Sequence, residues 1–145
     1  MKYFRLTEDR KTGHRPQFID WYKDLESQKQ DDVILFRIKE DSELIIPDIL
    51  LIPMVMVNRQ IKDIFVKYEP NASIHQVMLI NRNDSEPYEF YRIEIPEVTG
   101  IEEGKNLDKV IFKVSDVYES QIIVRLDFME SILRRDAVGF DIKEV

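Results

Sequence analysis

The side chains that could carry chemistry in this chain are two histidines, several serines and many carboxylates. His14 and His75 are the only histidines, and neither has a second histidine at the short spacings that place two imidazoles on one metal ion. No serine occupies the Gly-x-Ser-x-Gly turn that presents a nucleophile above a sheet. We therefore expect no metal and no cofactor, and the residue pattern assigns no catalytic residue.

The acidic residues occur in short groups between apolar runs. Three groups stand out, namely Asp31 with Asp32, the residues Glu40, Asp41 and Glu43, and the pair Glu102 and Glu103. Each falls in a predicted turn, where solvated charge is expected. General acid–base work would require burial that shifts a carboxyl pKa, which a turn does not provide. The structural interpretation of these acids is favoured over a catalytic one.

The residue types that the chain lacks exclude further chemistry. It has no cysteine, which rules out a disulfide framework, a thiol nucleophile and cysteine-ligated zinc. Its four glycines do not cluster into a loop that could cradle a phosphate. The net charge of −7 repels a phosphate backbone, so we expect no nucleic-acid partner.

Length and hydropathy predict one domain that spans residues 1–145. Hydrophobic residues make up 43% and charged residues 34%, a balance typical of a globular and not a disordered chain. Charges interrupt the first residues, which excludes a signal-peptide core there. The longest apolar stretch, 44–57, is broken by Pro47, Asp48 and Pro53, so we expect no membrane span and a cytoplasmic protein.

One pattern occurs twice, at about 54–79 and 121–145. Each copy has an apolar strand-like run, then apolar residues at helical spacing, then a second strand-like run. The pattern predicts one strand–helix–strand unit that is used twice to build one core, and it leaves open whether the copies share a sheet. Because strand–helix pairs are common, coincidence remains the alternative. The matched apolar positions are Val57 and Val124, Ile61 and Phe128, and Phe65 and Ile132.

The remaining segments complete the predicted α+β fold, a mostly antiparallel or mixed sheet with two or three helices. We expect Pro16 to open a helix whose Trp21 anchors the core, and Asn58 and Asp127 to cap the two repeated helices. His75 is expected to be half-buried in a strand. The segment 100–106 is expected to be an exposed acidic loop.

Three segments resemble a family of bacterial immunity proteins. The stretch Ile123 to Arg135, followed by Gly139 and Phe140, looks like the closing segment of immunity family eleven of the polymorphic toxin systems, which is typified by a myxobacterial protein. The middle segment of that family is similar to Asp48–Tyr68 with Glu69-Pro70-Asn71, and to Tyr88–Val98. The resemblance covers roughly 48–145, so the role of residues 1–47 is left open.

The resemblance implies a non-catalytic protein that protects its own cell by occluding a toxin domain. It implies no catalytic residues. We expect carboxylates to steer a basic partner and an apolar patch to anchor it. The residues that we expect at this partner-binding rim are Glu40, Asp41, Glu43, Glu102 and Glu103.

Two alternatives stand beside this hypothesis. One is a hydrolase-like enzyme with a site around His14 or His75, which would need a histidine that meets a serine hydroxyl or two carboxylates in a deep pocket. The other is a self-associating structural module, because exposed edges of short strands can pair across a homo-oligomer. The sequence does not decide the oligomeric state.

Overall fold

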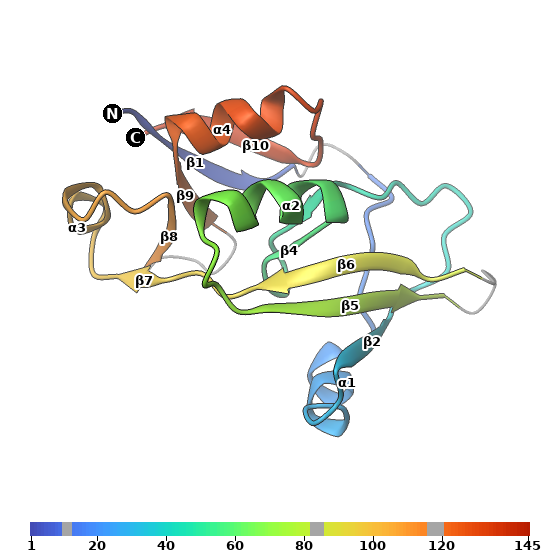
Figure 1. Cartoon of the computed structure of the whole chain (residues 1–145). Helices are drawn as coiled ribbons and strands as arrows, with labels where there is room; N and C mark the ends of the chain where they lie inside the picture. Colours follow the sequence, from blue (N-terminus) through green and yellow to red (C-terminus); the bar gives the residue numbers. More distant parts are fainter. Residues whose placement is uncertain (10–12, 82–85, 116–120) are drawn as a thin grey trace.

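Two five-stranded sheets and the helices packed on them form the part of the chain that the computed structural model describes, residues 1–9, 13–81, 86–115 and 121–145 (Figure 1). Sheet I has the order β10-β1-β9-β8-β7, and its strands are β1 (Tyr3–Glu8), β7 (Glu97–Val98), β8 (Ile111–Val114), β9 (Gln121–Arg125) and β10 (Phe140–Glu144). Sheet II has the order β2-β5-β6-β4-β3, and its strands are β2 (Val33–Arg37), β3 (Ile49–Leu50), β4 (Met56–Val57), β5 (Ile74–Ile80) and β6 (Tyr88–Ile93).

The α+β class and the mixed sheets predicted from the sequence are confirmed. The described ranges contain four helices, one more than the upper limit of the prediction. They are α1 (Trp21–Ser27), α2 (Arg59–Tyr68), α3 (Ile101–Asn106) and α4 (Leu126–Leu133). Among these residues, no helix has both the length and the apolar character needed to cross a membrane.

The repeated pattern folds as two split β-α-β units. In sheet II, β4 and β5 flank β6, which is antiparallel to both, and α2 connects them. In sheet I, β9 and β10 flank β1, again antiparallel to both, and α4 connects them. Each copy therefore belongs to its own sheet and encloses a strand from elsewhere in the chain, an arrangement known from ferredoxin-like folds.

The two copies meet in one core, as the pattern predicts. Helices α2 and α4 lie side by side (Figure 1). Between them the Phe65 and Phe128 rings meet edge to face with centroids 6.3 Å apart. All six matched apolar positions are buried in this cluster. Tyr68 packs against this cluster, and its hydroxyl lies 2.9 Å from Ser131 Oγ. Aromatic pairs of this geometry stabilise a core beyond the area they bury.

The outer face of each sheet is also covered. Helix α1 packs the partly buried Trp21 and Leu25 against the far face of sheet II, so Trp21 contacts the core while part of its ring stays accessible. On sheet I, a smaller cluster surrounds Phe112 and Tyr3. Helix α3 approaches this cluster so closely that a Cβ at Gly104 would collide with the Phe112 ring. Glycine is required there by close packing and not by backbone conformation.

Two capping predictions have different outcomes. Asn58 caps α2 as predicted, because its side-chain oxygen accepts from Ile61 N at 3.0 Å. The prediction for Asp127 is wrong, since α4 has no side-chain cap. Both Asp127 oxygens instead accept from the Arg125 guanidinium at 2.8 Å, and this pairing holds the pKa of Asp127 below its usual range.

Three further expectations are wrong. Pro16 does not open α1, which begins at Trp21 after Asp20 adopts a left-handed conformation with φ 45°. His75 is exposed and not half-buried, and its Nε2 lies 3.7 Å from Glu94 Oε1. The expected loop at 100–106 forms α3, because the Glu103 carboxylate accepts the backbone N–H of Thr99 ahead of the first turn.

Candidate functional site

The candidate site is a hollow of about 480 Å³ between the end of β1, the segment before α1 and the turn at residues 52–53. It is lined by Glu8, Gly13, His14, Arg15, Pro16, Gln17, Phe18, Trp21, Ile52 and Pro53. Its lining combines aromatic, aliphatic and charged side chains. We refer to His14, Trp21 and Ile52 at this hollow, with the adjoining Asp41 and Glu43, as the His14 face.

Glu8 fixes the floor of the hollow. Its side chain is buried, and its Oε1 accepts the backbone N–H groups of Leu51 and Ile52 at 2.8 and 2.9 Å. Its Oε2 accepts from the Arg15 guanidinium. A buried carboxylate with these donors has its desolvation cost offset by charge-assisted hydrogen bonds. Glu8 therefore connects sheet I to the segment after β3.

His14 is held between two carboxylates. Its Nδ1 lies 2.9 Å from Asp41 Oδ2, and its Nε2 lies 2.9 Å from Glu43 Oε2. The hydrogen bond to Asp41 raises the pKa of His14, and the charges of both carboxylates add to that shift. The pKa of Asp41 is lowered, first by the Glu43 backbone N–H that its Oδ1 accepts and then by His14. The imidazolium form is therefore the one that this arrangement favours.

Apolar side chains are exposed beside these charges. Ile52, which lines the hollow, is 47% exposed, and Ile45, whose N–H donates to the His14 carbonyl, is 46% exposed. Tyr22 is 56% exposed and meets the Trp21 ring edge to face at 6.1 Å. Exposed aliphatic and aromatic side chains next to fixed charge are typical anchors of protein interfaces.

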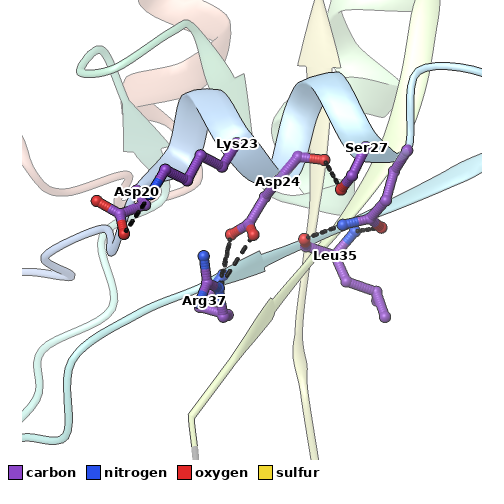
Figure 2. Close-up of polar contacts among 7 residues, drawn as sticks. Asp20, Lys23, Asp24, Ser27, Leu35 and Arg37 are labelled. Atoms are coloured by element: carbon purple, nitrogen blue, oxygen red, sulfur yellow. Dashed lines mark hydrogen bonds and ion pairs between the residues drawn. The ribbon is translucent and has the colours of Figure 1, made fainter.

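Helix α1, whose first residue is Trp21, is fastened to β2 by polar side chains (Figure 2). The buried Asp24 carboxylate accepts Arg37 N at 3.1 Å and Arg37 Nε at 3.0 Å. One turn later, Gln28 accepts Leu35 N at 2.8 Å and donates to the Leu35 carbonyl at 2.9 Å. These side chains occupy the hydrogen-bonding groups on the outer edge of β2, so α1 cannot shift without leaving them unpaired.

The structure separates the five residues predicted for the rim. Asp41 and Glu43 meet around His14, whereas Glu40 lines a second hollow with Arg37 and Lys39. Glu102 and Glu103 belong to α3, which lies at the left of Figure 1, far from the segment between β2 and β3 at the right. The Thr99 hydroxyl holds the pKa of Glu103 down, and Glu102 is exposed.

The pairing of His14 with Asp41 and Glu43, and the roles of Glu8 and Arg15, were not predicted from the sequence. Among the described residues, no group of three or more histidine or acidic side chains is arranged to hold a metal ion.

No protein-family model matches the chain, and no curated protein matches it. The geometry of the His14 face is therefore the structural feature that bears on function.

Proposed function

We propose that this chain is a cytoplasmic, non-catalytic immunity protein that neutralises a toxin domain by binding and occluding it. The observation that supports this function best is the His14 face, where two fixed carboxylates adjoin exposed apolar side chains. The resemblance of 48–145 to immunity family eleven adds the class of partner. Glu102 and Glu103 remain predicted contributors to steering and not to the contact itself.

The physical roles divide between charge and apolar area. The net charge of −7 attracts a basic partner and speeds the encounter, an effect that salt weakens. Ile52 and Tyr22 then supply apolar surface that loses water on contact. Because Glu8 and Asp24 hold the surrounding segments, this face is already formed before binding, which reduces the entropy lost on association.

The test is binding to the protein encoded by the neighbouring gene, measured by titration calorimetry with purified proteins. We expect Ile52→Glu to weaken binding by roughly a hundredfold, because a charge replaces an apolar side chain that the complex would bury. Glu43→Lys should weaken it less and mainly slow association. Glu130→Lys on α4 makes the same charge change at an exposed position outside the predicted rim and serves as the matched control. The absence of a complex, or equal effects of all three variants, would count against the proposal.

A second candidate function has one observation in its favour, because His14 meets two carboxylates, as the hydrolase hypothesis requires. Both ring nitrogens are occupied, however, so neither is available to take a proton from a nucleophile. Hydrolysis of ester or phosphoester substrates that is lost in His14→Gln and retained in His75→Gln would support the enzyme. A chain without such activity that binds the neighbouring gene product would support the immunity protein.

A further inference from the structure

Strand β10 has an open edge in the part of the chain that the structure describes. It pairs with β1 on one side and with no other described strand on the other. The other sheet edges differ. The outer edge of β2 is occupied by Asp24 and Gln28 of α1, and β3 and β7 have two residues each. An exposed five-residue edge is a template for another strand.

The register of β10 shows which backbone groups are open. Val145 N donates to the Tyr3 carbonyl, and Asp9 N donates to the Gly139 carbonyl. Hydrogen-bonded pairs alternate along an antiparallel ladder, so the odd-numbered residues of β10 turn toward β1. The N–H and C=O groups of Phe140, Ile142 and Glu144 therefore face outward.

We propose that a second copy of this chain adds to this edge, with the two β10 strands antiparallel about a two-fold axis at Ile142. In that register Ile142 faces Ile142 of the second copy, and Phe140 faces Glu144 of the second copy. Both are hydrogen-bonded pairs and use the outward groups only. The two copies of sheet I would join into one continuous sheet.

The side chains of β10 are complementary to themselves in this register. Asp141 lies opposite Lys143 of the second copy, and Lys143 lies opposite Asp141 of the second copy, both as non-hydrogen-bonded pairs with close side chains. Neither residue forms an ion pair within the described residues, and both are exposed. Within one chain, Lys143 instead lies opposite Arg5, a like charge, and the second copy supplies the missing counter-charge.

The exposed Ile142 side chain of β10 also favours pairing with a second copy of the chain. Ile142 is 42% exposed, although it lies opposite the buried Leu6 and points to the same face of sheet I. Pairing with a second Ile142 would cover the exposed part. A two-fold contact of this kind is self-complementary and closes at the dimer, so it does not lead to open polymers.

Charge exchange across the proposed axis tests the register. We expect wild-type protein to dimerise in sedimentation velocity over a concentration series at about 0.15 M salt, where long-range repulsion is screened. Asp141→Lys and Lys143→Asp should each raise the dimer dissociation constant roughly tenfold, because each places like charges opposite one another. The double variant should restore wild-type affinity, and a mixture of the two single variants should form a heterodimer.

Two control variants, on the side of the molecule where α1 lies, separate the effect of the β10 charges on dimerisation from the effect of net charge. Asp32→Lys and Lys39→Asp make the same charge changes at exposed positions away from β10, and should leave the dimer unchanged. Amide hydrogen exchange at Phe140, Ile142 and Glu144 should slow as concentration rises. A chain that stays monomeric throughout, or a dimer that is insensitive to both single variants, would overturn the proposal.

Discussion

His14 shows how a side chain in an irregular segment is fixed by charge. Its backbone has a positive φ of 60°, which costs energy for a residue with a Cβ. Each ring nitrogen lies beside a carboxylate, Nδ1 beside Asp41 and Nε2 beside Glu43. The segment before α1 is thereby attached to the connection between β2 and β3. The strength of this attachment depends on the protonation of His14.

At the residue scale, stability should depend on pH through His14. Its folded-state pKa is raised above the ordinary 6.5, mainly by the hydrogen bond to Asp41. The contribution is therefore fully present at pH values well below the ordinary pKa of 6.5, where both states are protonated, and is lost as pH rises through the folded-state pKa. It also declines in acid, when Asp41 protonates. Denaturant unfolding of wild type and His14→Gln across this range should show the two stability curves converge at high pH.

Asp41→Asn is the control for this prediction. It keeps a side chain of the same size and removes the charge, so the pKa of His14 measured by NMR should fall toward its ordinary value. If His14 has the same pKa in the wild type and in the Asp41→Asn variant, the assignment is wrong.

Helix α3 shows what the sequence could and could not predict at the scale of an element. Long apolar periodicity identified α2 and α4, and the repeat pattern identified the strands around them. Helix α3 has six residues and an acidic first turn, so its local pattern is that of a loop. Its stability comes from Glu103 bonding back to Thr99 and from Gly104 packing on Phe112, and the second of these contacts depends on tertiary structure.

The same limit applies to the candidate site. Carboxylates at 41 and 43 could be predicted as solvated surface groups from their turn-like neighbourhood. Their pairing with His14 could not, because Asp41 lies 27 positions after His14 and the two are brought together by backbone pairing of residues 17–19 with residues 37–39. The alternation of residues within a strand carries no information about which distant loop lies beside it.

Gly104 provides the prediction at the element scale. Gly104→Ala should destabilise the protein by about 1–3 kcal/mol, because the added methyl group collides with the buried Phe112 ring. Gly13→Ala is the control, because a Cβ at Gly13 meets nothing within 4 Å and the residue caps no described helix. Chemical denaturation of both variants compares them directly. Equal stability of the two would show that α3 does not pack on Phe112 as described.

At the scale of the whole molecule, the two sheets are held together where the repeated helices meet. Phe65 comes from the copy in sheet II and Phe128 from the copy in sheet I, and their rings are in edge contact. The buried cluster around them draws residues from both sheets and both helices. Because this cluster is shared, we expect the sheets to unfold together and not as separate units.

A double-mutant cycle measures this connection. Phe65→Leu and Phe128→Leu should each destabilise by about 1–3 kcal/mol, and the double variant by less than their sum, with a coupling of about 0.5–1.5 kcal/mol. Phe65→Leu with Phe112→Leu is the control pair, since Phe112 belongs to the separate cluster on the outer face of sheet I. Strict additivity for Phe65 and Phe128 would contradict the shared core.

The position of β1 between β9 and β10 has a consequence for how the chain is made. The strand is synthesised before all the strands of sheet II, whereas both of its neighbours are synthesised after them. At ordinary translation rates it waits on the order of ten seconds without a ladder partner. Sheet II, whose strands are complete by residue 93, can assemble during that interval. Sheet I then forms around β1 after sheet II has assembled. Until that step, the side chains of Tyr3 and Leu6, which are buried in the folded protein, stay accessible to chaperones.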